Sequence, residues 1–431
     1  MEWFLAWPAL AKVSLCFLLV VASSRFKVNL GLALAGAGAL LGLAMGLGPV
    51  KTGLTLLQGA TSPRTLSLAL LVALILALSQ LLKQSGQLDR MVEAFRGLVR
   101  SPRAVAAAMP AVIGLLPMPG GALFSAPMVD ASCRCGEHQA PGPGLLTAIN
   151  YWFRHHGEMW WPIYPGFILA VSLLQLPPWL FLVTMLPLVV VHLAAGTWFL
   201  LRPLKLEQAP PPASEDGRWR RLIRETMPIL IVVAVIPLSA LVSGIFDAAG
   251  VKPPWPSGAP LILGLAAACW QVALSNQLGG AAPLKALARR DTLGMLALIL
   301  GIMSFQAMMA GSGAVGQIQS ELVGYGVPLL AMIAVLPFIS GVVTGIAVGF
   351  VGASFPLVVP LFSDLTGTHF LAHAVLAYTA GFIGMLLSPV HLCLLVTKDY
   401  FHESFRDAYR RIAWPLVCLG LAAGLWYLVL V

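Results

Sequence analysis

The stretch PMPGGALFSAP, residues 117–127, places three prolines and two adjacent glycines inside an apolar segment. We expect no continuous helix through it, because proline removes a backbone hydrogen bond and glycine adds conformational freedom. Its last three residues, Ser125-Ala126-Pro127, return 229 residues later as Ser354-Phe355-Pro356. The sequence therefore interrupts two apolar segments in the same way, one in each half of the chain.

Two further pairs follow the same doubling at an offset of 227 residues: Ser85-Gly86 with Ser312-Gly313, and Pro162 with Pro389. A helix that stops inside a bilayer frees backbone N–H and C=O groups, which are tolerated only where they face protein, water or a ligand. Paired interruptions in two halves of a membrane protein are typical of a transporter's binding site. The doubling therefore predicts a two-repeat transporter.

The composition is that of a membrane protein. Of the 431 residues, 59% are hydrophobic and 10% are charged, whereas a soluble domain carries roughly 25% charged residues. Apolar stretches of about 20 residues recur throughout, which predicts a polytopic all-α protein. The net charge of +9 resides in short loops between these stretches, so it indicates membrane topology and not nucleic-acid binding. The sequence has no phosphate-loop, nucleotide-binding or metalloprotease motif, and we expect no enzyme.

We predict about ten transmembrane spans, two of them broken. They cover residues 3–22, 28–48, 66–83, 145–175 (broken), 178–201, 226–247, 257–277, 292–310, 370–397 (broken) and 413–431. Two more apolar segments, 104–130 and 327–363, hold many prolines and glycines. Each is either one kinked span or a re-entrant hairpin that enters and leaves on one side of the membrane.

The distribution of basic residues decides between these two interpretations. With two hairpins, 21 Lys and Arg fall on one membrane face and 3 on the other, whereas two single crossings divide them 12 to 12. The positive-inside rule favours the hairpins. Both termini then lie outside, hairpin 104–130 enters from the cytoplasm and hairpin 327–363 enters from outside. Each half holds five spans, so residues 1–201 and 226–431 form an inverted repeat, joined by a cytoplasmic linker at 202–225.

Two stretches, PMPGGALFSAP at 117–127 and NYWFRHHGEMWWPIYPG at 150–166, resemble an integral-membrane family known as domain of unknown function 401, and SPVH at 388–391 fits more weakly. That family is grouped with the ion transporter superfamily, alongside gluconate-type and dicarboxylate permeases. The resemblance implies an elevator-type transporter, in which two hairpins and two broken helices move against a scaffold that often dimerises. It also implies secondary transport, commonly of organic anions with sodium or protons. The Ser-Asn-Thr hairpin tips of the dicarboxylate relatives are absent from this sequence.

The first hairpin tip supplies candidate substrate ligands. Pro119, Gly120 and Gly121 leave backbone amides accessible, and a half-helix that begins near Gly120 points its positive dipole end at the site. Ser125 adds a hydroxyl one turn into this half-helix. The alternative interpretation is a tight turn whose serine bonds to its own backbone.

The second hairpin tip is a run of small residues with three candidate ligands, Thr344, Gly345 and Ser354. The same run contains glycines at a spacing of four residues, from Gly341 to Gly349. The alternative interpretation is that these glycines serve close helix packing.

The broken helix at 150–166 holds the densest group of polar and ionisable residues: Asn150, Arg154, His155, His156 and Glu158. Ionisable groups in a membrane segment are candidates for function. Arg154 could contact an anionic substrate, and Glu158 or a histidine could carry a proton. The alternative is an Arg154–Glu158 ion pair that only anchors the helix, with tryptophans at the membrane interface. Pro162 frees carbonyls that could coordinate a cation.

The matching break lies at residues 388–391 of the second half. Proline at position 389 removes one backbone hydrogen bond. Ser388 is a candidate substrate ligand, and His391 is either a proton carrier or a buried core histidine.

The sequence thus predicts a secondary active transporter of the bacterial or archaeal inner membrane, which moves a small organic anion, a carboxylate, by alternating access. Na+ or H+ is the expected coupling ion, and we expect no other cofactor. The expected partners are the anionic solute, membrane lipid and a second copy bound through the scaffold helices, without nucleic acid. The alternatives are a membrane-embedded lipid-processing enzyme and a channel. We expect no metal site, since Cys133, Cys135 and His138 do not make a four-ligand zinc pattern.

Overall fold

The computed structural model describes residues 7–431 apart from 27, 97, 99–100, 118–120, 134–140, 205–216, 252–254, 256–257 and 327. The described residues form α-helices, two short 3-10 helices and one π-helical turn, and no strand occurs among them. The expectation of an all-α fold is confirmed.

The first half of the chain contributes ten α-helices within the described residues, interrupted by η1 (His156–Met159) and followed by the π-helical turn η2 (Thr197–Leu201). The helices are α2 (Ala9–Arg25), α3 (Leu30–Ala44), α4 (Gly48–Thr61), α5 (Pro63–Gln84), α6 (Gln87–Arg96), α7 (Pro102–Gly114), α8 (Ala122–Cys133), α9 (Pro143–Arg154), α10 (Pro165–Leu174) and α11 (Pro178–Gly196).

The second half repeats this order of elements. Its helices are α12 (Arg218–Ala248), α13 (Ala259–Ser275), α14 (Ala282–Leu287), α15 (Arg290–Gly311), α16 (Ala314–Tyr325), α17 (Leu329–Thr344), α18 (Ala347–Val358), η3 (Val359–Phe362), α19 (Gly367–Leu386), α20 (Leu392–Tyr400) and α21 (Phe405–Leu430). Five of them, α15, α16, α17, α20 and α21, begin 227 residues after α5, α6, α7, α10 and α11. The same offset separates Ser85-Gly86 from Ser312-Gly313 and Pro162 from Pro389.

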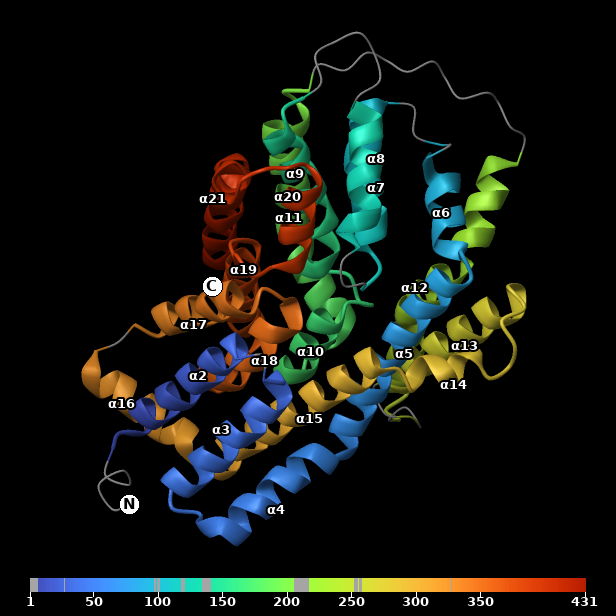
Figure 1. The fold of residues 1–431 in the computed structure, drawn as a ribbon. Helices are drawn as coiled ribbons and strands as arrows, with labels where there is room; N and C mark the ends of the chain where they lie inside the picture. Colours follow the sequence, from blue (N-terminus) through green and yellow to red (C-terminus); the bar gives the residue numbers. More distant parts are fainter. Residues whose placement is uncertain are drawn as a thin grey trace.

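Contacts between the halves occur in exchanged pairs. Helix α3 packs on α15 while α13 packs on α5, α6 packs on α12 while α16 packs on α2, and α10 packs on α18 while α20 packs on α8. Exchange of this kind, in which element i meets j and j meets i, is the property of a two-fold arrangement. The two halves therefore interlock and do not form separate domains (Figure 1).

The doubled Ser-Gly pairs end equivalent helices. Ser85 follows α5 and Ser312 follows α15, and the next residue in each case, Gly86 or Gly313, has a positive φ, of 67° and 71°. The two serine hydroxyls accept hydrogen bonds from the backbone N–H two residues later. Glycine is favoured after the serine because it adopts this left-handed conformation without strain.

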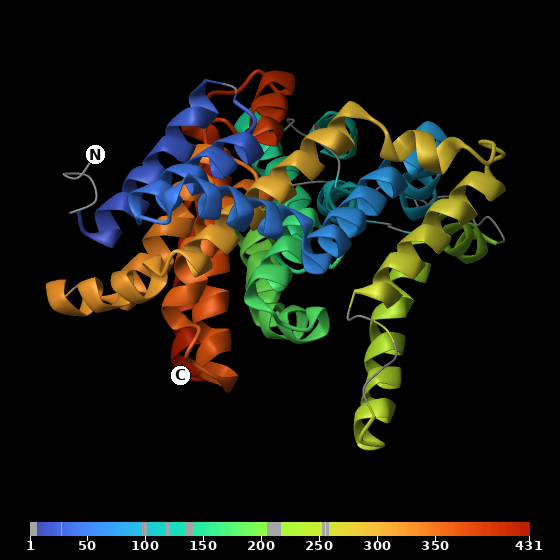
Figure 2. The same cartoon turned by 90° about the horizontal axis from the view of Figure 1, so that it is seen from below.

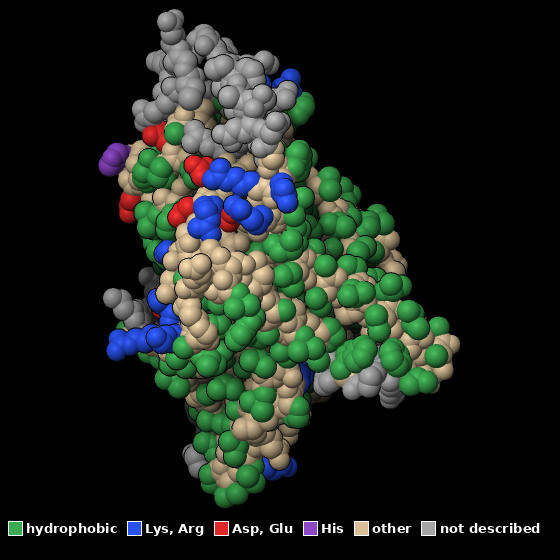
Figure 3. Space-filling model, turned by 90° about the vertical axis from the view of Figure 1, so that its right-hand side faces the viewer, with side chains coloured by type: hydrophobic (Ala, Val, Ile, Leu, Met, Phe, Trp, Pro, Cys, Tyr) green, Lys and Arg blue, Asp and Glu red, His purple; other side chains and the backbone are tan. Residues whose placement is uncertain are grey.

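Six helices are long and apolar enough to cross a membrane, judged by length and composition of the described residues: Pro63–Gln84, Pro178–Leu201, Trp219–Phe246, Arg290–Gly311, Gly367–Leu386 and Phe405–Leu430. Seven shorter apolar helices accompany them. One face of the molecule is largely apolar, with Lys, Arg, Asp and Glu gathered in a zone near its top (Figure 3). The chain is a multi-pass membrane protein, and the exact number of spans stays a prediction.

Two groups of helices can be distinguished. Helices α3, α4, α5 and α15 run diagonally below an upright cluster that contains α7, α8, α9, α11 and α20 (Figure 1). Helix α12 extends away from the remaining helices (Figure 2). Glycines bring the diagonal helices together: a Cβ at Gly31 would lie 2.2 Å from the Ala297 carbonyl oxygen, and one at Gly59 would lie 2.8 Å from that of Met303. Small residues permit such close approach in membrane proteins.

All four segments predicted to be interrupted contain a break. Segment 104–130 forms α7 and α8, which pack on each other, and segment 327–363 forms α17 and α18, which do the same. Segment 145–175 divides into α9, η1 and α10, and segment 370–397 divides into α19 and α20. The side of the membrane from which each helix pair enters stays a prediction.

The structure differs from the sequence prediction in three segments. Residues 48–61, nearly all outside the predicted spans, form α4, which packs on α3 and α15. Residues 314–325, also outside the predicted spans, form α16. Helix α12 begins at Arg218, inside the linker predicted at 202–225, because basic residues continue the helix beyond its apolar part.

Candidate functional site

The break between α9 and α10 meets the break between α19 and α20. Helix α9 ends at Arg154, η1 follows, and α10 starts at Pro165. Proline cannot continue the hydrogen-bond ladder, so Pro162 and Pro165 keep the segment between η1 and α10 non-helical. On the other side α19 ends at Leu386 and α20 starts at Leu392, with Pro389 between them.

Two tyrosines exchange hydrogen bonds across these breaks. The Tyr151 hydroxyl donates to the Leu386 carbonyl at 3.0 Å, and the Tyr378 hydroxyl donates to the Glu158 carbonyl at 2.6 Å. Both rings are fully buried, and the two tyrosines are 227 residues apart. Each half thus donates a hydrogen bond to a carbonyl at the break in the other half.

The α7–α8 pair packs against the break between α9 and α10. A Cβ at Gly114, the last residue of α7, would lie 2.0 Å from the Arg154 carbonyl oxygen. A Cβ at Gly121, just before α8, would lie 2.5 Å from a terminal nitrogen of the Arg154 guanidinium. The absence of both side chains allows the Arg154 backbone and guanidinium to lie against the α7–α8 turn.

The α17–α18 pair packs in the equivalent way against α19 and the break between α19 and α20. Gly345, between α17 and α18, has φ of 62°, and a Cβ there would lie 2.8 Å from the Ser388 hydroxyl oxygen and 3.0 Å from the His391 backbone nitrogen. A Cβ at Gly341 would lie 2.2 Å from the Gly381 carbonyl oxygen on α19. Gly341 therefore serves helix packing, as the alternative interpretation held, whereas Gly345 contacts the site.

The starts of four half-helices meet in this region. Helix α10 and helix α18 start side by side, since a Cβ at Gly166 would lie 2.6 Å from the Ala347 side chain. Helix α20 starts beside Gly345, and helix α8 starts beside Arg154. The N-terminal end of a helix carries partial positive charge and unpaired N–H groups. The breaks therefore bring several positive helix ends to one place.

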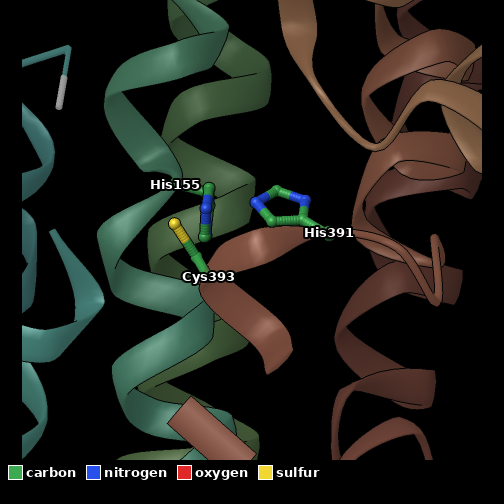
Figure 4. Close-up of side chains that lie close together, drawn as sticks. All are labelled: His155, His391 and Cys393. Carbon is green, nitrogen blue, oxygen red and sulfur yellow. The ribbon is translucent and has the colours of Figure 1, made fainter. Parts of the chain in front are cut away.

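The ionisable side chains of the two breaks form a buried cluster. Arg154 is 1% exposed, His155 is 0% exposed and Glu158 is 8% exposed. His155 Nε2 lies 3.9 Å from a Glu158 carboxylate oxygen, and the rings of His155 and His391 are centred 4.5 Å apart. The tips of the two histidines and of Cys393 converge between α9 and α20 (Figure 4).

An amide adjoins this cluster on the neighbouring turn of α9. The side-chain Nδ2 of Asn150 donates to the Thr397 hydroxyl of α20 at 2.9 Å, and both residues are fully buried. Asn150 Oδ1 has no hydrogen-bond partner among the described residues. An unpaired buried acceptor of this kind is a position where a solute or a water can bind.

Four predicted ligands use their hydroxyls locally. Ser125 donates to the Ala122 carbonyl at 3.5 Å, Ser354 to Phe350 at 2.6 Å and Thr344 to Ser340 at 2.8 Å, each within its own helix. The Ser388 hydroxyl accepts from the Val390 N–H at 3.3 Å. The alternative interpretation of a self-bonded serine therefore describes Ser125, and Ser354 bonds to its own helix in the same way, while Ser388 still adjoins Gly345.

His156 belongs to a separate contact network. Its Nδ1 lies 2.9 Å from the Phe153 carbonyl oxygen. The neighbouring Trp152 ring stacks on His192 of α11, with centroids 4.1 Å apart. His156 is thus not in the His155–His391 group. Pro119 and Gly120 lie outside the described residues, as do Cys135 and His138, while Cys133 is buried at the end of α8.

Sequence reasoning missed Tyr151, Tyr378, Cys393 and Thr397. The two tyrosines carry the same 227-residue offset as the doubled Ser-Gly and Pro pairs, and a search for that offset among aromatic residues would have found them. No spacing signal relates Cys393 or Thr397 to residues of α9, because those contacts depend on how the two halves pack.

Two solved structures with a similar fold are described as an efflux pump and a transporter. The chain resembles MtrF of Neisseria gonorrhoeae, described as one of a class of antimetabolite efflux pumps, with a TM-score of 0.58 and 14% identity over 89% of this chain and 84% of that one. It also resembles the YdaH transporter of Alcanivorax borkumensis, described as having an unusual topology, with a TM-score of 0.56 and 15% identity over 87% and 86% of the two chains. At these identities the likeness shows the fold.

Comparison with curated proteins gives no match. The profile of one family, described as protein of unknown function (DUF401), matches residues 9–248 and 261–431, which is nearly the whole chain. The chain therefore belongs to the family DUF401.

Proposed function

We propose that this protein is a secondary active transporter of a small organic anion, with the carboxylate class as substrate. The observation that carries the proposal is the position of Arg154, whose buried guanidinium lies against Gly121 at the start of α8. A guanidinium and the positive end of a half-helix both favour an anion at the same place.

The arrangement of the half-helices supports a transport role. In several transporter folds the N-terminal ends of discontinuous helices point at the anionic group of the substrate near the membrane midplane. Here the starts of α8, α10, α18 and α20 approach one another around the breaks. The α7–α8 and α17–α18 pairs act in this proposal as the two re-entrant hairpins of an inverted repeat.

Proton coupling is favoured over sodium coupling. Glu158 is a buried carboxyl able to take up and release a proton. Two of the carbonyls freed by the breaks, at Glu158 and Leu386, already accept from tyrosine hydroxyls. A sodium ion bound there would share each of these oxygens with a tyrosine donor.

Export is the direction to test first, because one structure with this fold is described as an efflux pump. We place the protein in the bacterial or archaeal inner membrane, where the upright cluster carries the solute past the diagonal helices as in an elevator mechanism. A lipid-processing enzyme would need an activated nucleophile, and the hydroxyls of Ser125 and Ser354 bond instead to their own helices.

The test begins with purified protein in detergent. Wild type, Arg154→Gln and the control Arg103→Gln, which removes an exposed arginine on α7, are screened by thermal shift against gluconate, succinate, citrate and benzoate. Each carboxylate is tested with and without sodium at pH 5.5 and 7.5. We expect at least one carboxylate to raise the Tm of wild type and of Arg103→Gln by several degrees but not that of Arg154→Gln, since a ligand at 100 times its Kd stabilises by about 2.7 kcal/mol.

A carboxylate that binds is then followed in proteoliposomes with an imposed pH gradient. Proton-coupled transport predicts concentrative movement that collapses with a protonophore. Equal binding by wild type and Arg154→Gln would contradict the proposed role of Arg154, and transport that needs sodium but no pH gradient would contradict proton coupling.

A further inference from the structure

We infer that His155, His391 and Cys393 form a binding site for a zinc-like transition-metal ion where the two broken helices meet. The three possible ligand atoms, two imidazole nitrogens and one sulfur, all lie within 4.8 Å of one another. His155 follows α9 in the first half, while His391 and Cys393 belong to the start of α20 in the second. Such a site would join the two halves directly (Figure 4).

The surroundings fix both imidazoles in a suitable tautomer. His155 Nδ1 lies 2.6 Å from the Tyr151 carbonyl oxygen, and His391 Nδ1 lies 3.2 Å from that of Met385. Each Nδ1 therefore carries the proton and donates it, which leaves the Nε2 lone pair for a metal. A ring nitrogen bonded to a backbone carbonyl is the usual outer-shell support of a metal-binding histidine.

His155 Nε2 is the observation that points to a ligand. This atom is deeply buried and has no hydrogen-bond partner among the described residues, on a side chain that is 0% exposed. Burying an unpaired acceptor costs free energy, which coordination of a metal ion would offset. Glu158 lies 3.9 Å from the same nitrogen but is not one of the three residues whose ligand atoms all lie within 4.8 Å of one another.

The ligand types select the metal. Two imidazoles and a thiolate suit Zn²⁺ and its neighbours, whereas Mg²⁺ and Ca²⁺ take oxygen ligands. Tetrahedral ligation at zinc distances separates ligand atoms by roughly 3.3–3.8 Å, so side-chain shifts of about 1 Å would complete the site. The Cys393 thiolate would offset part of the charge of a divalent cation.

The test uses the full chain in detergent, freed of metal by a chelator and titrated with Co²⁺ as a spectroscopic probe for zinc. We expect a thiolate-to-cobalt charge-transfer band that saturates at one equivalent and is reversed by Zn²⁺. Cys393→Ser should abolish the band. Cys269→Ser, the control, removes another buried thiol, which bonds to the Leu74 carbonyl in α5, and should retain the band.

Two further variants keep the test decisive if Cys393→Ser does not fold. His155→Asn and His391→Asn should each weaken Co²⁺ binding at least tenfold. A wild-type protein without a saturable band, or a band that survives in Cys393→Ser, would overturn the inference. The cobalt titration does not depend on the proposed substrate. A carboxylate screen in which no compound binds would leave the result of the titration unchanged.

Discussion

At the scale of single residues, equivalent positions of the two halves, 227 apart, share the residues that pack at the breaks but differ in the residues that carry charge. Gly114 of α7 and Gly341 of α17 each approach a carbonyl of the helix after next, on α9 and α19, and the two exchanged tyrosines keep their type. The partner of Arg154 at this offset is Gly381, and the partner of Glu158 is Met385. The halves therefore share the residues that shape the breaks, and only the first half places a charged pair of residues there.

The exchanged tyrosine bonds can be tested by Tyr151→Phe and Tyr378→Phe. Each variant leaves a buried carbonyl without its donor, so each should lower the free energy of unfolding by about 1–3 kcal/mol. The measurement is the apparent Tm in detergent. Tyr325→Phe removes an exposed hydroxyl and serves as the control. Unchanged Tm values in both buried variants would show that the two hydrogen bonds carry no net stability.

At the scale of elements, the sequence predicts where an apolar segment is interrupted better than it predicts where each helix begins and ends. All four interruptions were predicted because proline and glycine act locally. Helix α4 was missed because it is stabilised by packing on α3 and α15, which no local pattern encodes. The same limit applies to the site: Arg154, His155 and Glu158 stand out as charges in an apolar run, whereas the approach of His391 and Cys393 to them depends on how the halves pack.

The tip between α17 and α18 gives a prediction at this scale. Gly345→Ala adds a methyl group that would clash with Ser388 and His391, and it also places alanine at a positive φ. Gly313→Ala, the matched control, has a similar positive φ but open space around its Cβ. Both variants carry the backbone cost of about 1–2 kcal/mol, and Gly345→Ala should carry a further 1–3 kcal/mol or so from overpacking. Equal losses of Tm would contradict the close approach of this tip to the break.

The start of α2 gives a second prediction. The Glu321 carboxylate of α16 accepts hydrogen bonds from the Ala9 and Leu10 N–H groups, both at 2.7 Å. Glu321→Gln removes a charge that favours the positive end of α2, so the free energy of unfolding should fall by about 1 kcal/mol. Glu93→Gln, which affects an exposed pair with Arg221, should cost less. Both are compared by apparent Tm, and a larger loss in Glu93→Gln would contradict the capping role.

At the scale of the whole molecule, the exchanged helix contacts support an inverted repeat, and its orientation follows from charge. We predict that both termini lie outside, with the linker in the cytoplasm. Alkaline phosphatase fused after Val431 should be active in whole cells, whereas a phosphatase inserted at residue 210 should be inactive. The opposite pattern would reverse the topology without changing the fold.

The two tyrosine hydrogen bonds between the halves have a consequence for biogenesis. The Glu158 carbonyl receives its donor from a residue 220 positions later in the chain. When only the first half has entered the membrane, the Glu158 carbonyl therefore lacks its donor. The ribosome must translate much of the second half before the Tyr378 hydroxyl can form this hydrogen bond. Each half is thus an incomplete protein on its own, and co-expression of the two severed halves should rescue what neither achieves alone.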